Sequence, residues 1–444
     1  MSEYFNNPIS SKILQNELPD YRKPAEFARK AICQMIGLVD NLVRQQMQEI
    51  LQNELQDYSS ATQFIRNLTS EITGRVDYFV QMQSPEVMIS FFETSLRDGA
   101  QSPGNAFTDQ EKIIYTEELI KALFDFIEVG FPAAHGDATG QIVDHVVERG
   151  LGHISKIVAL CRLNAGDIEK AKLALDALPD GQGVIHCFIA TSKVHREYKL
   201  KGKPINSIID DISKLFATIN KDEPGKYKIM FSLEDATNTP DKDLRCVIEA
   251  AVQNGADFIN IPDTIGSAQV REVGDLIERV CNFVNIAKRK FSIDRDVVVH
   301  YHGHNDLGHA VSASLEAMLA GAGGLQGTTS GMGERAGNTN LTTLMSNMLA
   351  RPDIYGKYHF KVKAEELYRI TADMDDSLGT YYAERMKKGF IHTSGIHQAN
   401  LGNQIVRTIS NPDEVIKIGN MVLFIDKIQK EIIVELVLEI FTYP

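Results

Sequence analysis

The sequence predicts an α/β protein built on a (β/α)8 TIM barrel, with an N-terminal helical region and a C-terminal helical arm. From about residue 88 onward, short apolar runs rich in β-branched residues alternate with longer amphipathic stretches. Runs of the first kind are typical of buried strands, and stretches of the second kind are typical of helices that cover a sheet. Eight such pairs over roughly 260 residues match the arithmetic of a TIM barrel. The expected strands are 87–95, 124–129, 155–160, 183–190, 226–233, 257–261, 296–302 and 324–329.

A doubly wound parallel sheet is the alternative interpretation of the same alternation. It would need a glycine-rich GxGxxG turn directly after an early strand, where the turn binds the phosphates of a dinucleotide. The only similar segment in the sequence, 331–337, comes late and has a different spacing. We therefore assign a barrel to residues 88–350.

Residues 1–87 differ from the barrel in composition and are expected to form a separate helical region. They are rich in Gln, Asn, Leu and Ile, and apolar residues such as Ile32 and Ile36 recur at helical spacing. The segment ILQNELPDY at 13–21 returns almost unchanged at 50–58. We interpret this repeat as two similar helix ends in a small bundle.

Residues 351–444 are expected to form a C-terminal helical subdomain. The helical pattern returns from Lys363 through Thr380, and a loop-rich segment follows. The final stretch, 431–444, is very apolar apart from a narrow stripe of glutamates at helical spacing. Its apolar faces need a partner surface, either the barrel or a second subunit, and we expect a homodimer.

The composition limits the classes of partner. The chain carries 46 Lys and Arg residues against 59 Asp and Glu, a net charge of −13. This balance argues against a broad nucleic-acid surface, because phosphate binding needs clustered cations. The sequence has no apolar run of membrane-spanning length and no secretory signal pattern, and its five cysteines are scattered as reduced thiols. We expect a cytoplasmic protein that binds neither nucleic acid nor membrane.

A pair of histidines at the end of the seventh expected strand is the sharpest chemical signal. His302 and His304 are at positions i and i+2, so they point to the same face of a strand. At a barrel mouth two imidazoles form half of a divalent metal site, and Asp98 and the amide of Asn338 lie at matching strand ends. This mixed nitrogen and oxygen set suits Mn²⁺, Zn²⁺, Mg²⁺ or Co²⁺. The alternative is a pair of hydrogen-bonded histidines inside the barrel, which is how we interpret His300 on the same strand.

Other polar residues at the expected strand ends are candidates for catalysis and binding. Arg97 precedes Asp98, where a guanidinium can stabilise an oxyanion or clamp a carboxylate, and its alternative role is a salt bridge across the mouth. Glu234 and His397 are the candidates for acid–base work. Further polar groups at or near strand ends are Gln101, His186, Thr191, Ser232, Asn260 and Thr264.

The segments that contain these residues resemble those of the metal-dependent Claisen-condensing TIM-barrel family. That family contains 2-isopropylmalate synthase, homocitrate synthase and citramalate synthase, with hydroxymethylglutaryl-CoA lyase as a cousin. The resemblance covers about 90–412, and the SPG, GFPAA and IATS segments are most similar to 2-isopropylmalate synthase. The collinear segments are ETSLRDGAQSPG, IEVGFPAA, IHCFIATSKVH, FSLEDAT, INIPDTIG, HGHNDLGHAV, SGMGERAGN and HTSGIHQ.

The resemblance implies an acyltransferase that condenses acetyl-CoA with a 2-oxo acid, such as 2-oxoisovalerate in leucine biosynthesis. Asp98, His302 and His304 would then bind the divalent metal, with Asn338 close to or in its coordination sphere.

The resemblance also implies roles for the remaining site residues. Arg97 would stabilise the developing alkoxide, while Glu234 and His397 would act on the acetyl-CoA methyl group and on the later water. The residues expected to bind substrate are Gln101, His186, Thr191, Ser232, Asn260 and Thr264.

Departures from the family pattern leave alternatives open. Asn238 stands where Arg is usual, Ala399 replaces the Asp of HQDG, and Arg407 or Thr408 lies near the place of a usual Tyr. Too few residues follow Gln398 for the amino-acid-sensing domain of some family members, so we expect no leucine feedback.

Pyruvate or 2-oxoglutarate is an alternative acceptor, because pocket shape decides that choice. A retro-Claisen lyase is a further alternative, although the segment GTTSGMGERAGN lacks the cysteine that the related lyases use. A non-catalytic barrel is the last alternative.

Overall fold

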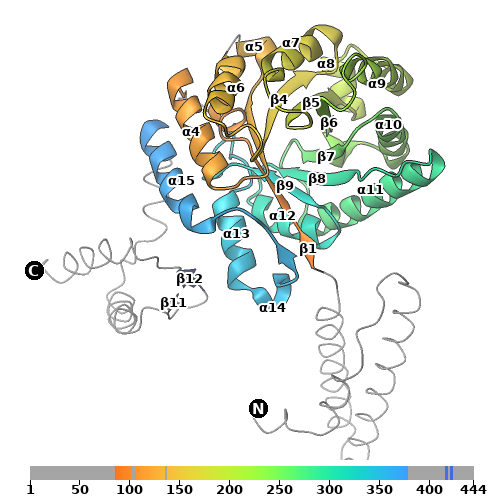
Figure 1. Cartoon of the computed structure of the whole chain (residues 1–444). Coiled ribbons are helices and arrows are strands. Elements are labelled where there is room, and N and C mark those ends of the chain that lie inside the picture. The colour runs from red at the N-terminus through yellow and green to blue at the C-terminus, as the bar shows by residue number, and fades with distance from the viewer. Residues whose placement is uncertain (1–85, 103–106, 136–137, 379–415, 419–420, 424–444) are drawn as a thin grey trace, which may run out of the picture. The chain divides into compact units, whose positions relative to one another are not determined.

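A computed structural model describes residues 86–102, 107–135, 138–378, 416–418 and 421–423 (Figure 1). The expected N-terminal helical region, the candidate His397, the departures at Ala399 and Arg407, and the apolar stretch 431–444 lie outside the described residues. No helix in the described part of the chain is both long and apolar enough to cross a membrane.

The described chain forms a closed barrel of eight parallel strands, which confirms the predicted fold. Each strand pairs with its sequence neighbours, and the last strand closes the barrel by pairing with the first. The apolar, β-branched runs fill these strands because a parallel strand is buried on both faces. The barrel strands are β2 (Ser90–Glu93), β3 (Phe126–Gly130), β4 (Lys156–Arg162), β5 (Gly183–Ala190), β6 (Tyr227–Glu234), β7 (Phe258–Asp263), β8 (Val298–Gly303) and β9 (Gly324–Gly327).

Amphipathic helices surround the barrel in Figure 1. The first of them, α4, begins at a capping box: the Thr108 hydroxyl accepts a hydrogen bond from the Glu111 N–H at 3.2 Å, and the Glu111 carboxylate accepts from the Thr108 N–H at 2.7 Å. The helices between strands are α4 (Asp109–Lys121), α5 (Pro132–His135), α6 (Ala138–Glu148), α7 (Ala165–Leu175), α8 (Lys193–Lys199), α9 (Ile205–Ile219), α10 (Asp241–Gln253), α11 (Val270–Lys290) and α12 (Ala310–Leu319). The short 3-10 helices η2 (Gly99–Gln101) and η3 (Ala236–Asn238) follow β2 and β6.

Helices also follow the last barrel strand. They are α13 (Leu341–Ala350), α14 (Pro352–Tyr355) and α15 (Ala364–Leu378). Helix α15 covers nearly the stretch expected from the periodicity, and Arg369 on it forms a salt bridge with Glu118 of α4 at 2.5 Å. Farther along the chain, β11 (Ile416–Ile418) and β12 (Met421–Leu423) form an antiparallel pair.

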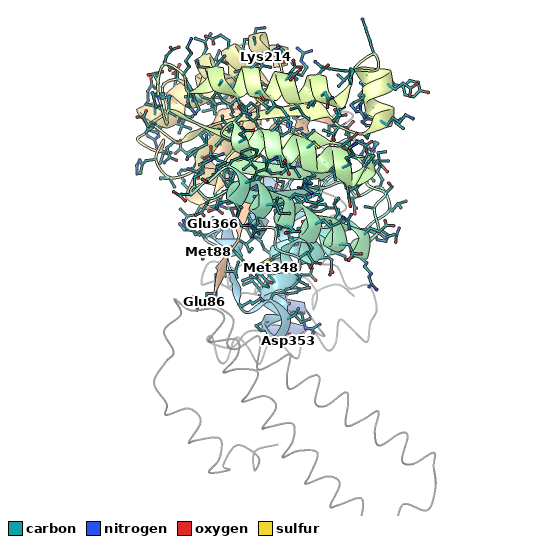
Figure 2. The ribbon with its side chains drawn as sticks, turned by 90° about the vertical axis from the view of Figure 1, so that its right-hand side faces the viewer. Glu86, Met88, Lys214, Met348, Asp353 and Glu366 are labelled. Atoms are coloured by element: carbon teal, nitrogen blue, oxygen red, sulfur yellow. The ribbon has the colours of Figure 1, made fainter. Side chains whose placement is uncertain are left out.

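The first expected strand, 87–95, is broken in the structure. Its start is a separate strand, β1 (Val87–Met88), which pairs in parallel with β10 (Tyr358–His359) outside the barrel. The change of partner falls between Ile89, whose N–H donates to His359, and Ser90, whose N–H donates to Gly323. In Figure 2, Met88 lies toward the same end of the described barrel region as Met348 of α13. A strand that changes partner keeps its apolar pattern, so the sequence shows one continuous run.

The interior of the barrel is filled by side chains. Phe92, Phe126, Val158, Val184 and Met230 form a buried apolar cluster there. Because side chains fill the interior, it is a packed core, and the active site of such a barrel lies at the carboxyl ends of its strands.

His300 lies inside this apolar interior, as the sequence predicts. Its ring meets the edge or face of Phe126 at 5.3 Å and of Phe258 at 5.4 Å between ring centroids. Neither ring nitrogen has a hydrogen-bond partner, and burial lowers the pKa of His300 to about 3, so the ring is neutral. Gly324 makes room for it, since a Cβ at that position would lie 2.3 Å from the imidazole.

Candidate metal centre and active-site cleft

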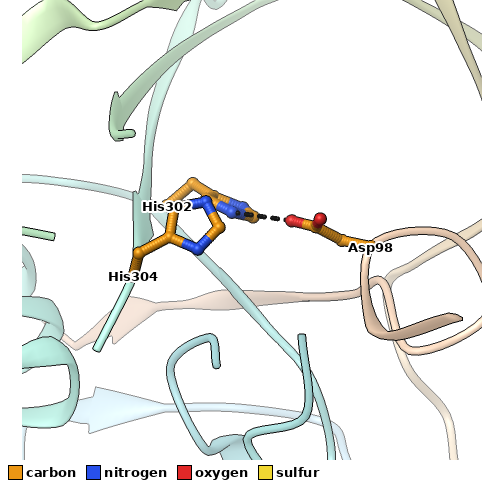
Figure 3. A group of neighbouring side chains, drawn as sticks. All are labelled: Asp98, His302 and His304. Carbon is orange, nitrogen blue, oxygen red and sulfur yellow. Dashed lines mark ion pairs between the residues drawn. The ribbon is translucent and has the colours of Figure 1, made fainter. Parts of the chain in front are cut away.

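Asp98, His302 and His304 converge at the carboxyl ends of β2 and β8 (Figure 3). One potential ligand atom of each lies within 4.8 Å of the other two. The Asp98 Oδ2 is 3.2 Å from the His302 Nε2, and the two imidazole rings are 5.0 Å apart. All three side chains are buried, and no other group of three or more His, Cys, Asp or Glu in the described residues could hold a metal ion.

The charges of these three residues suit a bound cation. Burial alone would raise the pKa of Asp98, but the charge of Arg97 and the contact with His302 outweigh burial and lower it. Burial lowers the pKa of His304 to about 4, so its imidazole is neutral and keeps a lone pair for a metal. An anionic oxygen and the neutral imidazole of His304 therefore lie together with His302 in one cluster.

Asn338 is the candidate for a second oxygen in this set. It forms an isolated bridge with His304, and its amide Nδ2 donates to the carbonyl of Met332 at 2.9 Å. That hydrogen bond leaves the buried Oδ1 without a partner, and the Nδ1 of His304 is also buried and unpartnered. Buried polar atoms without partners are rare in folded proteins. The donor set of two nitrogens and two oxygens fits Mn²⁺, Zn²⁺, Mg²⁺ or Co²⁺.

Arg97 is held beside Asp98 by a buried carboxylate. Its Nε and Nη2 contact the Glu128 Oε2 at 2.6 and 2.5 Å, and its Nη1 is 3.2 Å from the Asp98 Oδ1. The Thr94 hydroxyl also donates to Glu128 at 2.7 Å. Burial would raise the pKa of Glu128, but Arg97 and His186 lower it to about 2, so the carboxylate is charged. The guanidinium is therefore fixed at the edge of the metal centre.

A chain of hydrogen bonds continues from Glu128 across the mouth of the barrel. The Glu128 Oε1 is 2.7 Å from the Nδ1 of His186, whose Nε2 is 2.7 Å from the Ser232 hydroxyl. Asn260 donates to the same hydroxyl at 2.7 Å. Burial lowers the pKa of His186 despite the neighbouring carboxylate. Because Glu128 accepts at Nδ1, the neutral ring offers its Nε2 lone pair to Ser232.

The opposite wall of the mouth carries a second charged group. Glu234, at the end of β6, contacts the Nδ1 of His195 at 3.1 Å and also accepts from the Lys199 ammonium. His195 and Lys199 both lie on α8, which begins at an N-cap where Ser192 accepts from the His195 N–H. A spacing of four residues puts both side chains on one face of the helix.

These walls enclose a cleft of about 500 Å³. Most of the site residues expected from the sequence line it: Arg97, Asp98, Gln101, His186, Ser232, Glu234, Asn260, Thr264, His302 and His304. Its lining also contains the apolar side chains Phe131, Leu160, Phe188, Pro262 and Ile265.

Two of the expected residues do not line the cleft. Thr191 is fully buried, and its hydroxyl contacts the carbonyl of Glu234 at 3.2 Å and the hydroxyl of Thr239 at 2.8 Å. Thr191 therefore fixes the end of β6 instead of facing a ligand. Asn338 forms an isolated backbone bridge with His304 and is not among the residues that line the cleft.

The site also contains residues that were not predicted from the sequence, among them Glu128, His195, Lys199 and Gln326. Glu128 was visible at a strand end, and the spacing of His195 and Lys199 after the IATS segment is the signal that could have found them. Asn238, the departure in the segment after β6, donates to Asp235 at 2.8 Å and so braces the turn that follows Glu234.

Arg335 ties together the loops on the far rim. It pairs with both carboxylate oxygens of Asp306, at 2.8 and 3.0 Å, and donates to the carbonyl of Thr264 at 2.8 Å. The loops after β7, β8 and β9 are thereby linked beside the cleft.

The fold places the chain among TIM-barrel proteins with a candidate metal site at the barrel mouth, and its sequence matches one protein family. Residues 88–374 match the HMGL-like family, so the chain belongs to that family.

The relatives that the chain resembles within the family include enzymes named 2-isopropylmalate synthase. The chain is 36% identical over 335 residues to that of Aquifex aeolicus, covering 74% of this chain and 61% of the relative. It is 35% identical over 333 residues to 2-isopropylmalate synthase 1 of Caldanaerobacter subterraneus, covering 73% of this chain and 79% of that one. The predicted family is therefore confirmed, although the matched region spans only 61% of the length of the Aquifex relative.

Solved structures agree with this fold. A hydroxymethylglutaryl-CoA lyase from Pseudomonas aeruginosa superposes with a TM-score of 0.54 at 18% sequence identity, covering 69% of this chain and 97% of that one. The lyase from Bacillus subtilis gives a TM-score of 0.51 at 16% identity, over 68% of this chain and 100% of that one. At these identities the likeness supports the barrel alone.

Proposed function

We propose that the chain is a divalent-metal-dependent acyltransferase that condenses acetyl-CoA with a 2-oxo acid. The acceptor that we propose is 2-oxoisovalerate, which would give 2-isopropylmalate for leucine biosynthesis. The observation that carries the proposal is the buried cluster of Asp98, His302 and His304 beside the fixed guanidinium of Arg97. The proposal includes the homodimer and the cytoplasmic location expected from the sequence.

The cleft suits a small branched 2-oxo acid. The carboxylate and ketone of such a molecule can both reach a cation held by Asp98 and the two histidines, while its alkyl group needs an apolar wall. Phe131 and Leu160 supply apolar surface within the same cleft. Burying a branched alkyl group against this surface favours binding by about 0.8 kcal/mol per methylene group.

The residues around the metal centre have complementary tasks. A divalent ion at this centre would supply Lewis acidity to the ketone of the acceptor. Arg97, held by Glu128 at 2.5 Å, aims a charged donor at the place where negative charge develops on that oxygen. Because the guanidinium is already fixed, little reorganisation is needed when the charge appears.

Proton transfer falls to the opposite wall. Glu234 lines the same cleft as the metal cluster, at the end of β6, which lies opposite β2 in the order of the barrel strands, and its carboxylate can take a proton from the acetyl methyl group. The carbon left behind attacks the ketone, and hydrolysis of the thioester by water then releases CoA and makes the condensation irreversible. His397 is the further candidate for work on that water.

The test is a thiol-release assay on the full chain. Purified protein would be supplied with Mn²⁺, Mg²⁺, Zn²⁺ or Co²⁺ in turn, with acetyl-CoA and a panel of 2-oxo acids. We expect metal-dependent release of free CoA that is fastest with 2-oxoisovalerate and is lost when a chelator removes the metal. No release with any acceptor would overturn the proposal, and faster release with pyruvate or 2-oxoglutarate would change the acceptor.

The same assay separates the proposal from lyase chemistry. Hydroxymethylglutaryl-CoA would be offered as the sole substrate, and we expect no cleavage. The segment between Gly327 and Asn338 contains no cysteine that could act as the acid of such a cleavage. Cleavage of this substrate would replace the synthase proposal with a lyase.

A further inference from the structure

Gln326 contacts the metal-site histidine from inside the barrel. It lies on β9 in direct register with His302 on β8, and it is fully buried. Its Oε1 is 3.2 Å from the Nδ1 of His302. At its other end, the Nε2 donates to the Sδ of Met230 on β6 at 3.3 Å. These contacts form one line from the apolar interior to the metal centre.

The chemistry of Met230 decides which way the amide points. A thioether sulfur is a weak acceptor and carries no proton to donate. The amide nitrogen of Gln326 therefore faces Met230, and its oxygen faces His302. The reverse orientation would bring the amide oxygen against the sulfur, with two acceptors and no hydrogen between them.

The orientation of the amide in turn decides the tautomer of His302. The oxygen of Gln326 can only accept, so its contact with His302 is a hydrogen bond only when Nδ1 carries a hydrogen. The lone pair of the ring is then on Nε2, which points at the Asp98 Oδ2 at 3.2 Å. A cation held between these two atoms would bind both of them, whereas a hydrogen on Nε2 would donate to Asp98 instead.

We propose that Gln326 is a positioning residue that selects the metal-binding tautomer of His302, and that Met230 holds Gln326 in the orientation this requires. The proposal rests on the metal centre of the proposed function. Without this arrangement the hydrogen can move to Nε2, where it donates to Asp98 and blocks the nitrogen that the metal needs. Outer partners of this kind usually contribute 10–100-fold to metal affinity.

The test measures binding of Co²⁺ or Zn²⁺ alone to the full chain, with no substrate. Three variants separate the contributions of the amide and the thioether. Gln326→Leu removes the acceptor, and we expect affinity to fall roughly 10–100-fold. Gln326→Glu keeps an acceptor for the Nδ1–H. We expect its affinity to stay within about threefold of wild type, a much smaller change than the loss expected for Gln326→Leu. Met230→Leu frees the amide to turn, and we expect a loss smaller than that of Gln326→Leu.

A matched control distinguishes tautomer selection from general loosening of the core. Met345 is a fully buried methionine on α13, outside the cleft lining. We expect Met345→Leu to bind metal like wild type, and we expect all variants to melt within a few degrees of wild type in the metal-free state. Met345→Leu losing as much affinity as Met230→Leu would overturn the role assigned to Met230.

A second readout follows the tautomer directly. The ¹⁵N chemical shifts of labelled histidines distinguish a protonated from an unprotonated ring nitrogen, and a His302→Ala spectrum identifies the signals of His302. At a pH where the metal-free ring is neutral, we expect a larger Nδ1–H population in wild type and in Gln326→Glu than in Gln326→Leu, because Asp98 competes for a hydrogen on Nε2 in all three. In Gln326→Leu we expect a substantial Nε2–H population.

The outcomes separate this inference from the proposed function. Wild type that binds no metal would overturn both, because the centre itself would be absent. Wild type that binds metal, with Gln326→Leu binding as tightly and showing the same tautomer, would overturn the role of Gln326 and leave the metal centre intact.

Discussion

The two walls of the cleft hold their charged side chains in different ways. On the metal wall, Arg97, Asp98 and Glu128 have side chains that are 11%, 5% and 0% exposed, and each contacts more than one partner. On the opposite wall, Glu234 is paired with Lys199, whose side chain is 54% exposed. Charge interactions are strong where water is excluded and weak where it is not. The metal wall therefore holds its charges away from water, whereas Glu234, the proposed base, is paired with a partner that water reaches.

The largest expected effect is loss of the metal centre in His302→Ala. Removing a ligand atom should cost more than the roughly 10–100-fold that removal of an outer partner costs. Titration calorimetry with Zn²⁺ or Mn²⁺ measures this loss. His145→Ala on α6 is the control, because that residue pairs with Glu117 at the surface. Wild-type affinity in His302→Ala would contradict the assignment of the metal wall.

A large effect is also expected from Arg97→Lys, which keeps the charge but loses the planar pair of contacts to Glu128. We expect kcat in the thiol-release assay to fall roughly 10²–10³-fold, as when a fixed oxyanion donor is removed. Arg351, which pairs with Asp353 through two contacts at the surface, is the matched control: Arg351→Lys should leave kcat unchanged. A loss below threefold in Arg97→Lys would show that fixed geometry is not what this wall provides.

The sequence predicted the strands well, because apolar β-branched runs are set by burial on both faces of a parallel sheet. It did not predict the break at Ile89, since the choice of pairing partner depends on where β10 lies. At the metal centre, the i, i+2 spacing of His302 and His304 predicted their convergence, although His304 lies one residue past the end of β8 and forms a bridge with Asn338 there.

The opposite wall was harder to predict. Glu234 ends a strand and was therefore visible, whereas His195 and Lys199 reach it from a helix that begins after a loop. The direction of that helix is a tertiary property. Thr191 shows the converse, since its strand end is polar but its hydroxyl is used within the backbone framework.

A pH experiment tests the protonation state of a buried carboxyl group on the strand that leads to Asp98. Glu93, at the end of β2, accepts from the backbone N–H of Ser95 at 3.0 Å and of Thr329 at 3.2 Å. Burial raises its pKa to about 7 despite these hydrogen bonds. Between about pH 4.5 and pH 7, the Glu93 carboxyl is protonated in the folded state and ionised in the unfolded state. Its contribution to the free energy of unfolding therefore falls as the pH rises through this range.

We therefore expect Glu93→Gln to gain stability relative to wild type over this pH range. The gain in the free energy of unfolding should approach about 3 kcal/mol at pH 8 compared with pH 4, measured by urea denaturation. Asp353→Asn, at an exposed surface pair, is the control and should show no gain of this sign. A constant difference between Glu93→Gln and wild type across the range would contradict the buried, protonated state.

The smallest effect is expected on the opposite wall, from Lys199→Met. Because the Lys199 side chain is 54% exposed, its pair with Glu234 should contribute no more than about 1 kcal/mol, or roughly fivefold in kcat/KM. We expect this loss to shrink further at 0.5 M salt, since exposed ion pairs are screened. A salt-independent loss above a hundredfold would mean that Lys199 works as a buried partner of Glu234 when substrate fills the cleft. The two walls would then be alike in the working enzyme, and the contrast between them would belong only to the state without substrate.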